Sequence, residues 1–572
     1  MTDMRRTLLW VVFTMSLVLL WDAWNKHTGQ PSIFGAPPSK PVASAPAAPA
    51  PAAASVPAGL PTPAAAPAPA GVPAAATVAG AAVTPAAVPN APVAAAEKVT
   101  ITTDVVRATI DTVGGSLVRL ELLKHTDQND TSRNVLLFDQ SAKRLYLAQS
   151  GLITSQAGVQ LPNHLTAMKV LTSERTLADG AAQIELKLES PAIDGRRLVK
   201  TYTFKRGDYV VGVKHEVFNE GAAAVNPQLY VQLARDGNPP EGESAFYFTF
   251  TGPALYTDAS KFTKVDFKDI EKGRASHDKA ADNGWVAMVQ HYFASAWLLP
   301  EKVQREFRTA KVADNHFSIA MVVPLGEVAP GASKAFESRL FAGPQEEHKL
   351  AALAPGLELV KDYGWFTVLA KPLFWLLDKL YDLLGNWGWA IVALVFLLKA
   401  AFYWLNASAY KSMAKMKAIN PRVMEMRERL KDKPQQMQQE MMRIYREEKV
   451  NPLGGCLPIV AQMPFFIALY WVLLSSVEMR QAPWIGWITD LAVKDPWFIL
   501  PLLMTASSLL QTWLNPTPPD PLQAKLMWIM PLAFSFMFFF FPAGLVLYWL
   551  TNNILSIAQQ WFINKRLGVL GK

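Results

Sequence analysis

The sequence predicts an α-helical polytopic membrane protein of six transmembrane helices, five of them forming a core, with a large periplasmic antiparallel β-sandwich and a cytoplasmic helical hairpin. Two observations support this fold class. Hydrophobic residues make up 51% of the chain and charged residues only 18%, which is typical of a membrane protein that carries a substantial soluble part. The apolar residues also follow two patterns. Long uncharged runs occupy both ends of the chain, whereas residues 98–343 alternate apolar and polar side chains.

Residues 1–24 combine Arg5 and Arg6 with an apolar run. A cleaved signal peptide would need small residues directly after the run, but WDAWNKH follows, so we predict an uncleaved transmembrane anchor. The two arginines place its N-terminus in the cytoplasm. Residues 25–97 are then a periplasmic linker, because their Ala- and Pro-rich composition offers little apolar surface to bury and proline interrupts any alanine helix.

Residues 98–343 have the two-residue period of half-buried strands, which predicts one antiparallel β-sandwich. Turn signals such as Val113-Gly114-Gly115 separate the runs. All eight histidines precede residue 349 and none has a metal-binding spacing, so we expect no metal site and no catalytic residue here. Three strands carry the clearest pattern, with one face formed by Ile184, Leu186 and Leu188, by Val211, Val213 and Val217, and by Leu229, Val231 and Leu233.

Residues 357–385 predict an amphipathic helix in the membrane interface, with Pro372 in its first turn. The predicted transmembrane helix 386–407 follows and contains a single charge, Lys399, with no acidic residue in the segment. Such a cation either bends its stem back to the headgroups or faces a hydrated cavity. Six apolar or aromatic residues follow Lys399 before the segment ends, and this distance favours the cavity.

Residues 408–452 hold eleven Lys and Arg against six Asp and Glu, a net charge of 11 − 6 = +5 that places this segment in the cytoplasm. We predict a helical hairpin whose first helix starts at Asn420-Pro421 and whose second helix follows Lys433-Pro434. Methionines recur at helical spacing and form either an ordinary packing seam or an adaptable surface for varied apolar partners. They are Met413, Met416, Met426, Met437 and Met441.

The rest of the chain is apolar and interrupted by short polar segments. The sequence Phe541-Pro542-Ala543-Gly544 divides the last apolar run, and its first piece is short enough to suggest local thinning of the bilayer. The single cysteine, Cys456, excludes an intrachain disulfide. We predict transmembrane helices at 453–477, 495–514, 526–541 and 543–564, a periplasmic loop at 478–494, a cytoplasmic loop at 515–525 and a basic cytoplasmic tail at 565–572.

Several function classes are disfavoured by what the spans contain. Lys399 is the only ionised residue in the five core spans when the span 495–514 is counted from Pro496, after Asp495, and this argues against a proton- or cation-coupled transporter. No nucleotide-binding G-x-x-x-x-G-K-[ST] motif occurs, so we expect no cofactor and no nucleotide hydrolysis. Asn552 and Asn553, with Gln559 and Gln560, add polar groups to a wet cavity around Lys399. Acidic or amphipathic segments that enter from the cytoplasm are the ligands this combination favours.

Five short motifs span the helical region in order and resemble the YidC family of bacterial membrane protein insertases, which is related to the mitochondrial and chloroplast insertases. The linker and the sandwich are similar to the Gram-negative branch of that family. The motifs are YKSMAKM at 410–416, NPLGGCLP at 451–458, QMPF at 462–465, VEMRQAPW at 477–484 and FPAGLVLY at 541–548.

The resemblance implies an insertase and chaperone of the bacterial inner membrane, not an enzyme, that helps integral membrane proteins to insert and fold, alone or with the Sec translocon. It implies a substrate groove at Lys399 and Gln462. The Gram-negative pattern usually has arginine at the position of Lys399, and lysine keeps the charge without the guanidinium fork. The helices at 453–477 and 526–541 are implied to form a hydrophobic slide that includes Met463, Phe466, Tyr470, Met530 and Phe534.

The implied partners are nascent integral membrane proteins, the lipid bilayer, the Sec translocon with its accessory subunits at the sandwich, and the ribosome or signal-recognition machinery at the hairpin. Two other classes remain open. A channel would need a through-pore. An envelope carbohydrate-binding protein would use the sandwich, which resembles sugar-mutarotase domains in fold, and would need paired carboxylates across a cleft.

Overall fold

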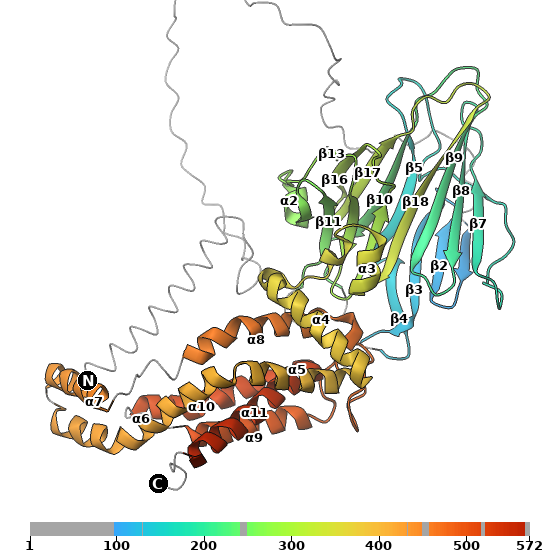
Figure 1. Cartoon of the computed structure of the whole chain (residues 1–572). Helices are drawn as coiled ribbons and strands as arrows, with labels where there is room; N and C mark the ends of the chain where they lie inside the picture. Colours follow the sequence, from blue (N-terminus) through green and yellow to red (C-terminus); the bar gives the residue numbers. More distant parts are fainter. Residues whose placement is uncertain are drawn as a thin grey trace, which may run out of the picture. The chain divides into compact units, whose positions relative to one another are not determined.

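The computed structural model describes residues 97–566 apart from 129, 241–248, 432, 449–456 and 516–520. These residues belong to one compact unit, Thr84–Lys572, which holds a β-rich domain followed by a helical region (Figure 1). The predicted anchor 1–24, almost all of the linker 25–97, Cys456, residues 516–520 of the loop 515–525 and most of the tail 565–572 lie outside the described residues.

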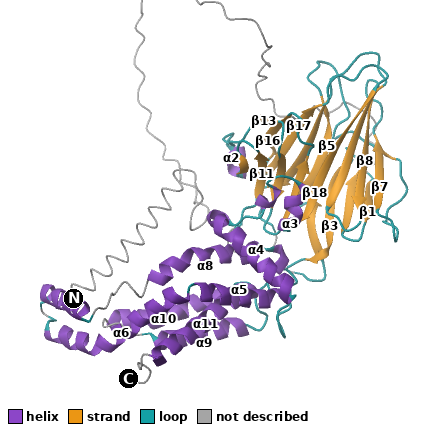
Figure 2. Ribbon diagram, in the orientation of Figure 1, coloured by secondary structure: helices purple, strands orange, loops and turns teal. Residues whose placement is uncertain are grey.

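The β-rich domain consists, in its described part, of two antiparallel sheets with nine strands each. Both sheets are drawn as orange arrows in Figure 2. The first sheet has the order β1 (Lys98–Thr102), β2 (Val106–Asp111), β3 (Ser116–Thr126), β4 (Asn134–Gln140), β5 (Leu145–Ile153), β10 (Gln228–Asp236), β17 (His316–Pro324), β16 (Arg305–Ala313) and β13 (Ala280–Ala281). The second has the order β12 (Lys261–Lys264), β11 (Gly252–Thr257), β14 (Trp285–Val289), β15 (Phe293–Leu298), β18 (Ser333–Pro344), β9 (Val210–Asn219), β8 (Arg196–Lys205), β7 (Gln183–Glu189) and β6 (Lys169–Val170).

The alternation in the sequence positions the core of this domain. Along β7 every second residue is buried, and Ile184, Leu186 and Leu188 are the buried ones, as predicted. The valines predicted for β9 and the apolar residues predicted for β10 are also buried, which confirms those two strands. Burial of one face fixes the register, because a slip by one residue would turn each apolar set toward solvent.

Strands β14 and β15 differ from this pattern, since every residue in both is buried. The segment that follows β18, with α3 (Glu347–Leu353) and the 3₁₀ turn η1 (Leu357–Val360), lies beside the start of β14. Leu350 and Leu357 belong to the same apolar core as the two strands. The Trp285 indole also donates a hydrogen bond of 3.0 Å to the Pro355 carbonyl. The start of the helical region is therefore packed against the sheet.

A group of polar side chains lies inside the sandwich. Gly114 has φ +71°, and a Cβ there would overlap the backbone of His164, so this turn requires glycine. The carbonyl of Gly114 accepts a hydrogen bond of 2.6 Å from Lys200 Nζ, which also donates to the Ser150 carbonyl at 2.7 Å. Burial lowers the pKa of Lys200 to about 7, because the interior disfavours the charged ammonium.

The helical region follows the sandwich, and its helices α5, α8, α9, α10 and α11 lie alongside one another (Figure 1). Helix α4 packs on α5 and α8, and α11 packs on α5 and α9. The bounds are η2 (Gly364–Phe366), α4 (Thr367–Leu384), α5 (Trp387–Ala401), α6 (Tyr403–Arg429), α7 (Pro434–Glu447), α8 (Leu457–Ser475), η3 (Val477–Met479), α9 (Ile499–Leu514), α10 (Pro521–Phe538) and α11 (Ala543–Arg566); the sandwich also carries α2 (Phe267–Glu271).

The predicted continuous helix over 386–407 is wrong. The chain leaves helical geometry at Phe402 (φ −90°, ψ 10°), and α5 and the first part of α6 meet at 68°. The contacts at the bend are tertiary: the Phe402 ring packs on Phe465 at 5.1 Å, and Gln559 donates to the Tyr403 carbonyl at 3.3 Å. In the described part of the chain no single helix has both the length and the apolar character needed to cross a bilayer, whereas this bent pair has them together.

Two predictions about proline are also wrong. Helix α6 runs through Pro421 instead of starting there, and Pro372 lies inside α4 instead of in its first turn. A proline removes one helical hydrogen bond, and packing on both sides of it compensates for this loss. Ile419 and Val423 flank Pro421 in the hairpin core, and Leu373 and Phe374 anchor α4 next to Pro372.

Helices α6 and α7 form a hairpin held by a small apolar core. Ile419, Val423, Met426 and Ile444 are buried there, and Met416, Met437 and Met441 pack against them. Met413 is half-buried and lies outside this cluster. Four of the five predicted methionines therefore contact the seam between the two helices, which supports the packing interpretation over the adaptable surface.

Candidate functional site

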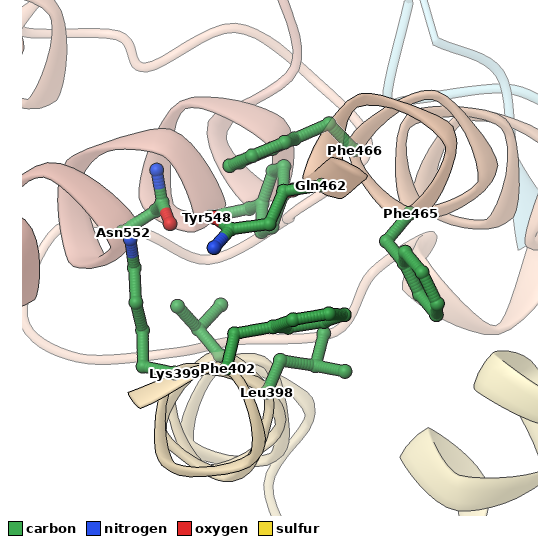
Figure 3. A pocket seen from close by; sticks show the side chains of 9 residues that line it. Leu398, Lys399, Phe402, Gln462, Phe465, Phe466, Tyr548 and Asn552 are labelled. Atoms are coloured by element: carbon green, nitrogen blue, oxygen red, sulfur yellow. The ribbon is translucent and has the colours of Figure 1, made fainter. Parts of the chain in front are cut away.

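A recess lies between three helices of the helical region. Helix α5 contributes Lys399, α8 contributes Gln462 and Phe466, and α11 contributes Tyr548 and Asn552. Figure 3 shows Lys399 extending from α5 toward Asn552, with Gln462 facing it from α8. The recess encloses about 20 Å³, which is room for about one water molecule. The other residues that line it are Val395, Leu398, Phe402 and Phe465.

Lys399 has a neutral partner in this recess. Its Nζ donates a hydrogen bond of 2.7 Å to Ser556 Oγ on α11, and Ser556 in turn donates to the Asn552 carbonyl at 2.7 Å. No carboxylate of the described residues forms an ion pair with Lys399, so its charge is available to an acidic group that enters the recess.

Gln462 joins α8 to the segment beyond the bend. Its Nε2 donates a hydrogen bond of 2.7 Å to Asn406 Oδ1, and both side chains are buried. The Nδ2 of Asn406 finds no acceptor among the described residues. An unsatisfied buried amide is costly, so Asn406 Nδ2 remains a hydrogen-bond donor next to Gln462, which lines the recess.

The two asparagines predicted for the groove lie in different surroundings. Asn552 is half-buried and lines the recess. Asn553 is only 8% exposed and donates to Ser507 Oγ at 3.0 Å and Ser508 Oγ at 3.2 Å. Both serines belong to α9, so the structure brings Asn552 to Lys399 and brings Asn553 to the contact between α9 and α11 instead.

The five residues predicted for the hydrophobic slide fall into two groups. Met463, Met530 and Phe534 are more than half exposed on the outer surface of α8 and α10. Phe466 and Tyr470 of α8 are half-buried and face α11: the Phe466 ring lies 5.9 Å from Tyr548 and the Tyr470 ring 6.4 Å from Trp549. Phe538 of α10 also packs on Trp549, at 4.8 Å. An aromatic cluster around Trp549 of α11 therefore connects α8 and α10.

Three residues of the recess and its surroundings were not predicted from the sequence: Ser556, Asn406 and Tyr548. Tyr548, Asn552 and Ser556 are spaced four residues apart, which puts them on one face of α11. That polar stripe was the available signal for Ser556. Asn406 had no such signal, because its role depends on the bend at Phe402. No group of three or more potential metal ligands occurs in the part of the chain that the structure describes.

Comparison with known proteins identifies the family. Residues 98–376 match the family described as YidC periplasmic domain, and residues 379–569 match the family described as 60Kd inner membrane protein. A curated protein of Cupriavidus necator named membrane protein insertase YidC is 57% identical over 570 residues, 99% of this chain and 98% of its own length. The chain belongs to the YidC family of membrane protein insertases.

The YidC family resemblance drawn from the five motifs is thus confirmed. Among solved structures, a crystal structure of an active YidC insertase covers 81% of this chain and 91% of its own, at 18% identity and a TM-score of 0.37. A galactose mutarotase related enzyme of Lactobacillus acidophilus covers 43% of this chain and 97% of its own, at 10% identity and a TM-score of 0.28.

Proposed function

We propose that this chain inserts integral membrane proteins into the bacterial inner membrane by guiding their apolar segments along α8 and α10 while Lys399 receives an acidic group of the translocated part. The observation that carries the proposal is the ammonium of Lys399, bonded to the neutral hydroxyl of Ser556 in a recess whose other lining residues are uncharged. A carboxylate that crosses hydrocarbon is costly, and an opposite charge part-way across offsets several kcal/mol of that cost.

The exposure of three apolar side chains supports a client-binding surface on α8 and α10. Met463 on α8 and Met530 and Phe534 on α10 each expose at least half of their surface. Such side chains are unfavourable in water and suit contact with lipid or with a client helix. Methionine and phenylalanine also adapt to partners of varied shape. We infer that Gln462 and Asn552 complete the groove, that Asn553 instead joins α11 to α9, and that no catalytic residue is involved.

The topology and the partners follow from the distribution of charge. We propose six transmembrane helices, with both termini and residues 408–452 in the cytoplasm and residues 25–356 in the periplasm, because Lys and Arg concentrate in the cytoplasmic segments. The bent pair α5 and α6 supports one of these spans. Nascent membrane proteins are the clients. We infer that the sandwich meets the Sec translocon and that the basic hairpin meets the ribosome or the signal-recognition machinery.

The test compares two clients that differ at one position, one with Asp and one with Asn in the translocated tail. Lys399→Leu is expected to slow insertion of the Asp client by at least about tenfold while changing the Asn client little, because only the first needs the charge. Lys399→Arg keeps the charge and is expected to insert both clients. Equal loss for both clients in Lys399→Leu, at normal protein level, would show that Lys399 is structural.

A further inference from the structure

A second buried lysine lies outside the recess. Lys361 follows η1, and its side chain has no solvent exposure. Its Nζ contacts both carboxylate oxygens of Glu478, at 3.1 and 3.0 Å. The Phe374 ring of α4 lies below the ammonium, with its centroid at 3.7 Å, and Glu347 Oε2 of α3 lies at 4.0 Å. The ammonium thus contacts groups from three segments, and the second carboxylate, Glu347, itself accepts a hydrogen bond of 2.6 Å from the Tyr363 hydroxyl.

This cluster is attached to the end of a recess wall. Glu478 lies in η3, three residues beyond Ser475, the last residue of α8. Ser475 Oγ donates a further hydrogen bond of 2.8 Å to the Asp362 carbonyl, next to Lys361. The same helix α8 carries Gln462, Phe465 and Phe466 of the recess. Contacts at Lys361 therefore restrain the C-terminal end of the helix whose other turns line the recess.

Two more contacts restrain the same end of α8 from the sandwich. His291, between β14 and β15, hydrogen-bonds the Leu474 carbonyl at 2.8 Å. Burial lowers the pKa of His291 to about 4, so the ring is neutral and donates through Nε2–H at neutral pH. Arg480 donates to the Thr126 carbonyl at 2.6 Å and lies over the Phe293 ring. Contacts from the sandwich and from the segment around Lys361 therefore hold this end of α8. Among the contacts described, Lys361–Glu478 is the ion pair.

A buried ion pair differs from apolar packing in what it specifies. Its Coulomb attraction offsets the desolvation of the two charges only in a narrow geometry, so it adds little stability but disfavours other arrangements. A nearby pair provides the contrast. Lys371 of α4 pairs with Glu358 of η1 at 3.1 Å and is about one-third exposed, so this pair joins α4 to η1 and involves neither η3 nor α8. Of these two ion pairs, Lys361–Glu478 is the one that links the segment after the sandwich to the end of α8.

We propose that Lys361 is a positioning residue for insertion, which through Glu478 fixes the end of α8 and so sets the place of its client-facing surface relative to α11. This inference rests on the proposed function, since it assumes that clients contact α8. None of the contacts of Lys361 described above involves a recess residue or Met463, the exposed methionine of α8. Its effect passes through the helix, and loss of the pair is expected to misplace the surface without removing any group from it.

The first experiment measures client contact directly. A photoreactive amino acid replaces Met463 in the full-length chain in membranes, and crosslinking to a single-span client is quantified at matched protein level. Lys361→Met is expected to lower the crosslinking yield at least about threefold, because it leaves the largely buried Glu478 carboxylate without its ionic partner. Lys361→Arg keeps the cation and is expected to restore the yield. The control Lys371→Met is expected to match the parent.

The second experiment measures position without a client. Spin labels at Met463 of α8 and Ile554 of α11, both about half exposed, report the distance between the two helices in a chain whose Cys456 is replaced by serine. Lys361→Met is expected to broaden the distance distribution, and Lys371→Met is not. The double variant Lys361→Met/Glu478→Met replaces the pair by apolar groups and is expected to stay folded, yet to keep the broad distribution.

These outcomes separate the two proposals. Absence of any crosslink from Met463 in the parent chain, while the client still inserts, contradicts the proposed function. A parent crosslink with unchanged yield and unchanged distances in Lys361→Met contradicts the positioning role alone. Full recovery in the double methionine variant also contradicts it, because packing would then suffice. A double variant that folds with a low yield supports the ion pair as the positioning contact.

Discussion

At the scale of single residues, the hydrogen-bond partner of a polar side chain shows whether that side chain belongs to the recess or to the packing between helices. Asn552 and Asn553 are neighbours in the chain, but successive residues of a helix point about 100° apart. One therefore lines the recess with Lys399, while the other is bonded to Ser507 and Ser508. The Tyr548–Asn552–Ser556 spacing places the Lys399 partner on the recess side of α11.

This difference between the two asparagines predicts opposite effects. Asn553→Ala removes two hydrogen bonds from a buried contact and is expected to lower the free energy of unfolding by about 1–2 kcal/mol. Asn552→Ala, at a half-buried position, is expected to leave stability near the parent value. The measurement is the thermal unfolding midpoint of the purified full-length chain. A midpoint that falls equally in both variants would contradict the assignment of Asn553 to the α9–α11 contact.

At the scale of elements, tertiary contacts override local signals. Helix α6 passes through Pro421 because apolar residues on both sides of it are buried against α7. Helix α5 ends at Ala401, although the sequence stays apolar as far as Leu405, because Phe402 and Tyr403 make contacts to α8 and α11. The hairpin seam and the bend are therefore properties of packed pairs of helices and not of one helix alone.

The hairpin seam can be tested by two substitutions on α7. Ile444 is 2% exposed, and Ile444→Ala is expected to cost about 2–4 kcal/mol because it creates a cavity between the helices. Met442 is 48% exposed, and Met442→Ala is expected to cost little. Hydrogen exchange of α6 and α7 should become faster only in the first variant. Equal exchange in the two would mean that the seam does not hold the hairpin together.

Three largely buried histidines make the stability of the sandwich depend on pH. Burial lowers the pKa of His125, His164 and His291 from 6.5 to about 4 each. The unfolded chain thus binds more protons between pH 6.5 and 4, so the free energy of unfolding is expected to fall as the pH falls through this window. The loss is up to about 3 kcal/mol for each imidazole and is complete below pH 4.

The measurement for this prediction is urea unfolding of the full-length chain at pH 7, 6 and 5, followed by protease resistance of the sandwich. His291→Gln keeps a donor for the Leu474 carbonyl and removes one titrating group, so its stability should depend less on pH. His348→Gln is the control, because that ring is 69% exposed. A parent stability that is flat from pH 7 to 5 would contradict neutral burial of these histidines.

At the scale of the whole molecule, the sandwich and the helices are joined by contacts between residues far apart in the chain. His291 and Leu474 are 183 positions apart, and Thr126 and Arg480 are 354 apart. Such contacts make Thr84–Lys572 one compact unit. A sandwich anchored at the end of α8 suits the proposed arrangement, in which it lies on the periplasmic side of the membrane.

The proposed topology predicts a protease pattern. Protease added to spheroplasts is expected to reach residues 25–356 and to leave the hairpin 408–452 intact, because only the first segment faces the periplasm. Antibodies to the sandwich and to an epitope near Glu447 follow the two fragments, and lysed cells provide the control in which the hairpin is accessible. Cleavage within 408–452 in intact spheroplasts would contradict the topology.

The sequence by itself determined the features that depend on local periodicity and on motifs. Alternating side chains in β7, β9 and β10 predicted a β-rich domain, because a half-buried strand must bury every second residue. The uncharged runs predicted the helical region, and the charge isolated at Lys399 marked the recess before its walls were known. Five motifs in order identified the family, since together they are far more specific than any one of them.

Only the tertiary structure decided which residues meet. The partner of Lys399 is 157 positions away, that of Gln462 is 56 away and that of Lys361 is 117 away. Periodicity reports how a segment divides its own faces but not which distant segment covers them, so the bend at Phe402 and the different roles of Asn552 and Asn553 could not be read from the chain. The free energy that selects these arrangements comes from burial and hydrogen bonding between helices, and it exists only once the helices have packed.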